Sequence, residues 1–447
     1  MEIIHLIAVF IFAAFALIVY LSTRRISDKE YLSNFGKTGF VSILFSLLAS
    51  LVGGWMFFGL TELGKTAGFA ALAIGLGYMI GLIIFSMSAG KIYSLMMKQE
   101  SHNLVDVIGS CFNSRVHKAA TLVNIIFFIG VISAQYLAMF TFFKSILNIE
   151  SPLLSISVAL IVILYTTYGG FKGVIVSDKL QFIAIAILAA FILPLIGAKE
   201  EHLSSLPSVY FSGLGNGIAF LIVALTLFPA SIFCRADIWQ RVASAKSAND
   251  FRLAIFLAIP LLLVFYLVFT LLGMTVAETE SNPVELLHSF MSEQLNSSSM
   301  SFIILVTGIG SALLSTIDTN TNVAVGVISR LAIKQEVDRV NFYRKISFGV
   351  GIICFVMATV AANIVELIIA AGAIILVLLP TVICLLRLED KANNSQQESA
   401  FWSISIGLLA LIITLVFVNS TIAFIIGFLA SSGTWFITKL FTKGGVK

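Results

Sequence analysis

Polar side chains concentrate in one otherwise apolar stretch of the chain, residues 310–322. Seven of the eight side chains in 315–322 are polar, and one of them is the carboxylate of Asp318. In a helix, residues spaced three and four apart share one face; here these are Ala312, Ser315, Thr316 and Thr319. Hydroxyl, carbonyl and carboxylate oxygens are the hard ligands that a small cation prefers. The alternative is that the hydroxyls only bond carbonyls of their own helix, a role that does not need so many polar side chains.

A second unusual feature is the glycine pair Gly53-Gly54, which interrupts the apolar stretch 47–59 and precedes Trp55. Paired glycines weaken a helix and let its backbone open. An opened helix that lines a cavity exposes carbonyl oxygens that can bind a cation. Alternatively, small residues allow two membrane helices to pack closely. The residues alone leave both interpretations open.

A third candidate is Asp178, which lies near the start of the apolar stretch 174–197. A carboxylate in the first turn of a helix is favoured by the helix dipole. An ionisable side chain inside a membrane span is also a candidate functional group. Again the residues do not separate the two interpretations.

The elements that carry these residues are predicted to be membrane helices. Of the 447 residues, 59% are hydrophobic and only 11% are charged, whereas soluble domains have about 25% charged residues. Apolar runs of about 20 residues recur along the chain, each long enough to cross a hydrocarbon core of about 30 Å. They leave no stretch for a separate soluble domain. We therefore predict a single all-α polytopic domain over residues 1–447.

The apolar runs predict thirteen spans. Their expected ranges are 3–22, 40–61, 67–90, 119–146, 152–168, 174–197, 216–234, 253–277, 300–329, 346–365, 367–386, 400–418 and 420–438. With the N-terminus outside, all 27 basic residues except Lys65, Lys144 and Lys199 fall on the cytoplasmic side, as the positive-inside rule requires. We predict a multi-pass protein of the plasma (inner) membrane with a cytoplasmic C-terminus.

The residues argue against a nucleic-acid-binding protein, a protein that binds a metal through cysteines and histidines, and an enzyme. The basic residues lie in short loops rather than in one patch, which argues against a nucleic-acid partner. The cysteines and histidines show no metal-binding spacing, and no catalytic motif of an enzyme is present. We expect no enzyme activity, no organic cofactor and no obligate protein partner, with the lipid bilayer as the surroundings.

Four stretches resemble the sodium:solute symporter family, whose members import small organic solutes with sodium. The most specific is 168–181, with Tyr168-Gly169-Gly170 followed by Asp178 and Gln181. The others are 237–246, which contains Gln240-Arg241, the hydroxyl run 315–319, and 49–59, which is similar to the proline-transporting branch. Weak similarity extends over nearly the whole chain.

The resemblance implies a LeuT-type fold, in which two inverted repeats of five helices form the transporter. The repeats would be 40–197 and 216–386, with one extra helix at 3–22 before them and two at 400–438 after them. The first helix of each repeat would be broken, at Val52-Gly53-Gly54 and near Phe228-Pro229, where proline removes a backbone donor.

The resemblance also implies ion ligands. The main sodium site would use the backbone carbonyls of Ala49, Val52 and Ala312 and the hydroxyls of Ser315 and Thr316. Asp178 matches an aspartate of the family that is linked to sodium. Some members bind a second sodium between that aspartate and two hydroxyl side chains. The two corresponding positions here are Asp318 and Thr319, so one of the hydroxyls is replaced by a carboxylate. The carboxylate of Asp318 leaves two possibilities open, a second sodium or a proton-linked group.

The implied function is sodium-coupled symport of a small organic solute into the cytoplasm, with Na⁺ as the coupling ion. By resemblance, the solute pocket would be formed by Gly53, Trp55, Gln135, Phe228 and Ser231. These side chains carry little charge and favour a neutral or zwitterionic solute, such as an amino acid, a sugar or a related metabolite. The alternatives are a proton-coupled symporter of the same fold and a transporter-like solute sensor.

Overall fold

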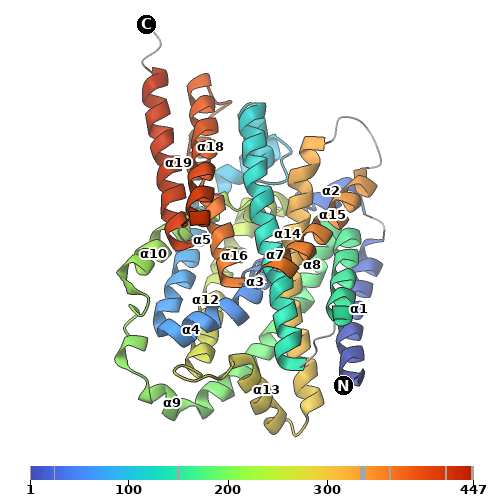
Figure 1. Ribbon diagram of the computed structural model, residues 1–447. Helices are drawn as coiled ribbons and strands as arrows, with labels where there is room; N and C mark the ends of the chain where they lie inside the picture. Colours follow the sequence, from blue (N-terminus) through green and yellow to red (C-terminus); the bar gives the residue numbers. More distant parts are fainter. Residues whose placement is uncertain are drawn as a thin grey trace.

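The computed structural model describes residues 2–24, 26–147, 152–332, 339–361, 364–417 and 420–443. These residues form a bundle of helices (Figure 1). The β-structure found among them is an isolated bridge between Thr38 and Ala245. The prediction of an all-helical protein is confirmed.

The long helices follow the predicted spans closely. The helices that overlap the predicted spans are α1 Glu2–Thr23, α3 Phe40–Leu51, α5 Leu72–Lys98, α7 Ser114–Leu147, α8 Pro152–Ala198, α10 Gly217–Cys234, α12 Ala248–Met274, α14 Ser298–Ala332, α15 Arg339–Val360, α16 Ile364–Leu376, α17 Leu379–Arg387, α18 Asn394–Phe417 and α19 Ser420–Lys443. Other helices connect them: α2 Asp28–Leu32, α4 Thr61–Ala67, α6 Leu104–Cys111, α9 Glu200–Ser205, α11 Ala236–Ser244 and α13 Pro283–Gln294. Three single turns complete the set: the π-helical η1 Met56–Leu60 and the 3₁₀ turns η2 Gly68–Ala71 and η3 Ser208–Tyr210.

Within the described residues, ten helical segments are long and apolar enough to cross a membrane. Two of them, Met56–Lys98 and Ile156–Ala198, have 43 residues each. A straight helix of that length would measure about 65 Å, roughly twice the hydrocarbon core. Each of these segments contains a glycine with positive φ, Gly68 at 57° and Gly170 at 53°. The count of thirteen crossings stays a prediction.

Gly170 marks the place where predicted spans 152–168 and 174–197 meet inside α8. Its φ of 53° and ψ of −166° interrupt the helical geometry, and residues with a side chain rarely adopt this conformation. A Cβ at this position would also collide with Tyr31. The hydroxyl of Tyr31 donates to the carbonyl of Thr167 at 2.8 Å. Helix α2, which contains Tyr31, therefore packs against the bend in α8 and stabilises it.

The expected break in the first core helix is present. Helix α3 ends at Leu51, Val52 has non-helical backbone angles, and helical structure resumes at Gly54 and continues into the π-helical turn η1 at Met56. The second expected break, at Phe228-Pro229, is wrong, because α10 continues through Pro229 to Cys234. Proline removes only its own N–H donor, and the neighbouring turn stays helical. The interruption comes later, at Arg235, whose ψ of 106° separates α10 from α11.

An interruption that was not predicted divides the span 367–386 into α16 and α17. It falls at Val377 and Leu378, just before Pro380. The hydroxyl of Ser431, on α19, donates to the carbonyl of Val377 at 2.8 Å. A partner from a neighbouring helix thus satisfies a backbone group that the break leaves free.

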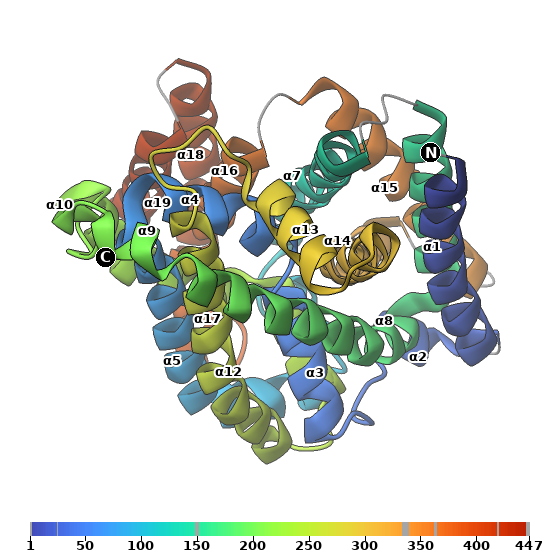
Figure 2. The same ribbon diagram turned by 90° about the horizontal axis from the view of Figure 1, so that it is seen from below.

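Helix α14 lies between α7, α8 and α15, as the view from below shows (Figure 2). Its polar run is buried as a consequence, and Ser315 and Thr319 have no exposed surface. α14 therefore brings its hydroxyls into the interior of the bundle rather than to the lipid.

Helix α1 begins at the lower end of the bundle, where α9 and α13 lie, and α19 ends at the upper end (Figure 1). We expect α9 to be extracellular and the α11–α12 connection to be cytoplasmic, following the distribution of basic residues. A Ser204→Cys variant should then react with a membrane-impermeant thiol reagent applied to intact cells, and Asn249→Cys should not. Both side chains are exposed, and the four native cysteines are buried. The opposite labelling pattern would overturn the orientation.

Candidate ion and solute site

The broken end of α3 lies directly against the polar face of α14. A Cβ on Gly53 would overlap the hydroxyl of Thr316, so the contact requires glycine. One turn away, the hydroxyls of Ser50 and Thr319 are 3.1 Å apart. No backbone hydrogen bond between described residues reaches the carbonyl oxygens of Ala49 or Val52. The break therefore presents two free carbonyls beside a row of hydroxyls.

The predicted sodium ligands all lie in this contact region and are buried. On α14, the hydroxyl of Thr316 donates to the carbonyl of Ala312 at 3.2 Å. The adjacent hydroxyl of Ser315 donates to Oδ1 of Asp178 at 2.7 Å. A hydroxyl that donates in this way keeps its lone pairs free to face a cation. The coordination of an ion by these groups stays a prediction.

Two carboxylates approach this region from α8 and α14. Oδ2 of Asp318 accepts hydrogen bonds from the hydroxyls of Tyr165 at 3.0 Å and Ser177 at 3.1 Å. The second oxygen of Asp318 and Oδ2 of Asp178 are buried without a partner among the described residues. A buried carboxylate oxygen without a donor is costly, and a bound cation or proton would compensate it.

Thr319 does not join these carboxylates. Its hydroxyl faces Ser50 on α3 and receives a hydrogen bond at 3.4 Å from Arg241. Asp318 faces α8 instead. The structure thus brings Asp178 to Ser315 but directs Asp318 and Thr319 to different helices, so these three predicted residues do not form one ligand set.

Arg241 is a central residue that sequence reasoning did not assign to the site. Its side chain has no exposed surface, and it donates to the hydroxyl and carbonyl of Ser46 and to the hydroxyl of Ser50. It also lies 3.5 Å from a carboxylate oxygen of Asp237. The guanidinium thereby joins α3, α11 and α14. In the sequence, Arg241 looks like any cytoplasmic arginine after a span, although the resembling Gln240-Arg241 pair marked its segment.

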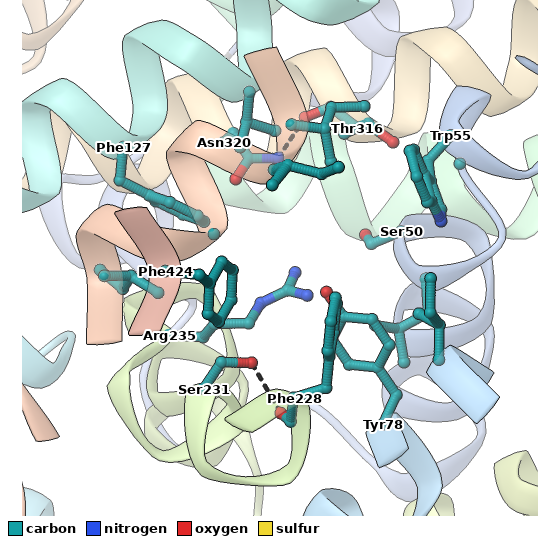
Figure 3. Close-up of a pocket in the computed structure, with 18 of the residues that line it drawn as sticks. Ser50, Trp55, Tyr78, Phe127, Phe228, Ser231, Arg235, Thr316, Asn320 and Phe424 are labelled. Carbon is teal, nitrogen blue, oxygen red and sulfur yellow. Dashed lines mark hydrogen bonds between the residues drawn. The ribbon is translucent and has the colours of Figure 1, made fainter. Parts of the chain in front are cut away.

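A cavity of about 160 Å³ adjoins the break. All five residues predicted for the solute pocket line it: Gly53, Trp55, Gln135, Phe228 and Ser231. Thr316 lines it as well, so the same helix face borders both the cavity and the predicted ion ligands. Figure 3 shows Thr316 and Asn320 on one side of the cavity and Phe228, Ser231 and Arg235 on the other.

Several lining residues were not predicted, among them Tyr78, Arg235 and Phe424. The ring of Phe228 packs edge-on against that of Tyr78, with 5.3 Å between the ring centroids, and stacks on that of Phe424, with 5.7 Å between the centroids. Phe424 belongs to α19, one of the two helices expected outside the core repeats. Aromatic residues are frequent throughout this chain, so no local pattern distinguishes those that face the cavity.

Solved structures with the same fold are membrane transporters. The chain superimposes on a Na⁺-coupled sialic acid symporter in a substrate-bound, outward-open state with a TM-score of 0.80, at 16% identity over 98% of this chain and 97% of that one. A nucleobase-cation-symport-1 family transporter in a closed conformation gives a TM-score of 0.54, at 14% identity over 94% and 96% of the two chains. These likenesses show a LeuT-type transporter fold.

A sequence model of the sodium:solute symporter family matches residues 31–407. The protein belongs to this family, and so its class is that of a membrane transporter rather than an enzyme. A search of curated protein sequences gives no significant match.

Proposed function

We propose that this transporter couples the inward movement of sodium to the import of a small neutral or zwitterionic organic solute across the plasma membrane. The observation that carries this proposal is the opened backbone at Val52-Gly53, which lies against the hydroxyls of α14 beside a cavity. Free carbonyls and hydroxyls at a broken helix are what a sodium site of this fold requires. The aromatic walls of the cavity suit a small organic molecule.

Coupling follows from shared residues. Gly53 and Thr316 touch one another and also line the cavity. An ion that orders this contact would shape the solute pocket, and bound solute would favour ion binding in return, since coupling between two ligands is reciprocal. The membrane potential contributes about 2.3 kcal/mol per charge per 100 mV, so each sodium that enters can drive solute accumulation.

We also propose the repeat boundaries 40–197 and 216–386. Their support is that an interrupted helix begins each of them, α3 with its break at Val52 and α10 with its break at Arg235. The second break lies closer to the cytoplasmic end than expected.

The coupling ion can be tested by uptake into proteoliposomes. A sodium gradient should drive accumulation of the solute, and replacing sodium by choline at constant pH should abolish it. The two unpaired carboxylate oxygens of Asp178 and Asp318 favour a proton-coupled symporter as the second candidate. Uptake that follows the pH gradient without sodium and is lost in Asp318→Asn would establish that candidate. Binding with no accumulation under either gradient would indicate a sensor.

A further inference from the structure

Arg235 places a charged group inside the solute cavity. It is the residue at which α10 ends, and its extended backbone turns the chain from α10 into α11. The side chain lines the cavity together with Phe228 and Ser231, which belong to the last turns of α10. Figure 3 shows the guanidinium pointing into the middle of this space. In the sequence this arginine was one of many cytoplasmic basic residues.

Arg235 forms an ion pair with Asp237, and it is the arginine of this pair that lines the cavity. Arg235 holds Asp237 through Nε at 3.0 Å and Nη2 at 2.8 Å. The Arg235 side chain is 15% exposed, whereas that of Asp237 is 1% exposed, and Asp237 is absent from the cavity wall that the described residues form. Asp237 also lies 3.5 Å from Arg241. One carboxylate thus lies beside two guanidinium groups, and of these two Arg235 is the one that lines the cavity among the described residues.

Two residues that line the cavity, Asn320 and Gln135, carry amide oxygens that lack a hydrogen-bond partner among the described residues. The side-chain nitrogen of Asn320 donates to the carbonyl of Thr316 at 2.7 Å, which leaves its oxygen buried without a partner in the described chain. The Oε1 atom of Gln135 is likewise buried without a partner. The hydroxyl of Ser231, in contrast, already donates to the carbonyl of Phe228 at 2.7 Å. Unpaired amide oxygens of this kind suit a solute that brings N–H donors.

We propose that the solute is an amino-acid-type zwitterion, with its carboxylate on Arg235 and its ammonium group facing the amide oxygens of Asn320 and Gln135. This inference rests on the proposed function and narrows its solute class. Guanidinium binds carboxylate in a planar, charge-assisted arrangement; two of the five N–H donors of Arg235 bond to Asp237, and the hydroxyl of Tyr78 lies beside the same group. The rings of Phe228 and Phe424 would contact an apolar solute side chain. A neutral sugar would bring no anionic group to the guanidinium.

The test is a comparison of matched solutes with the purified full-length protein. Thermal unfolding would be followed with each standard L-amino acid and with neutral sugars, in sodium chloride and in choline chloride. Every amino acid that stabilises the protein would be compared with its primary amide. We expect at least one amino acid to stabilise the protein in sodium. Its amide, which lacks the carboxylate, should bind about ten- to a hundred-fold more weakly.

Variants of Arg235 test whether this residue causes the difference in affinity between the amino acid and its amide. Arg235→Gln should remove most of the preference for the acid over the amide, and Arg235→Lys should restore part of it. Arg252→Gln, which changes an exposed arginine of α12, should leave the preference intact. The acid–amide comparison needs no variant and stands even if Arg235→Gln fails to fold.

Two outcomes would overturn the inference. One is an amide that binds as tightly as its parent acid. The other is sodium-dependent stabilisation by a neutral sugar and by no amino acid, which would leave sodium coupling intact while removing the zwitterion. Amino-acid binding that keeps the acid–amide difference but does not depend on sodium would instead contradict the proposed function and retain the role of Arg235.

Discussion

Replacing Arg241 by methionine is expected to lower the free energy of unfolding by about 3–5 kcal/mol, the usual cost of removing one partner from a buried charged network. The substitution keeps much of the side-chain volume but leaves the carbonyl of Ser46 and the hydroxyls of Ser50 and Thr319 without their donor. It also removes a positive charge that attracts Asp178 and Asp318. The contact between α3 and α14 should therefore loosen.

The loss can be measured from the denaturant dependence of helicity in detergent. Arg252→Met is the matched control, because that exposed arginine bonds to Ser86 and Asn249 and to no other described residue, and surface substitutions usually change stability by less than about 0.5 kcal/mol. Equal stability of the two variants would show that Arg241 does not hold the helices together.

Thr316→Ala is expected to weaken sodium binding by about ten- to a hundred-fold, since a ligand to a charged group contributes about 1.5–3 kcal/mol. The hydroxyl lies at the contact between the opened backbone at Gly53 and α14, where water cannot readily replace a lost ligand. Sodium affinity would be measured by thermal shift in the absence of solute, because Thr316 also lines the cavity. Solute affinity at low sodium should fall in parallel and recover at high sodium.

Two variants control for this result. Thr316→Ser keeps the hydroxyl and should keep most of the affinity. Ser311→Ala removes a buried hydroxyl of the same helix that has no partner in the described structure, and it should change sodium binding little. An unaltered sodium dependence in Thr316→Ala would mean that the ion binds elsewhere.

The membrane class and the all-helical fold could be predicted from the sequence alone, and most predicted spans overlap long helices that the structure describes. These features depend on hydrophobicity summed over about 20 residues, a signal that no single contact can change. The break at Val52-Gly53 was expected from the family resemblance, and the two adjacent glycines, which weaken a helix, are consistent with it. The hydroxyl face of α14 followed from helical periodicity alone.

Which polar groups contact one another could not be predicted from the sequence, because it depends on how distant helices pack. Pro229 predicted a break by its chemistry, but the chain stays helical there and opens at Arg235, since a proline costs one backbone bond that its neighbours can tolerate. The burial of Arg235 and Arg241 depends on how α11 packs against α3 and α14. This packing brings together residues almost 200 positions apart, such as Ser46 and Arg241. Composition and spacing are local, whereas the pairing of a buried charge is fixed by the packing of distant helices.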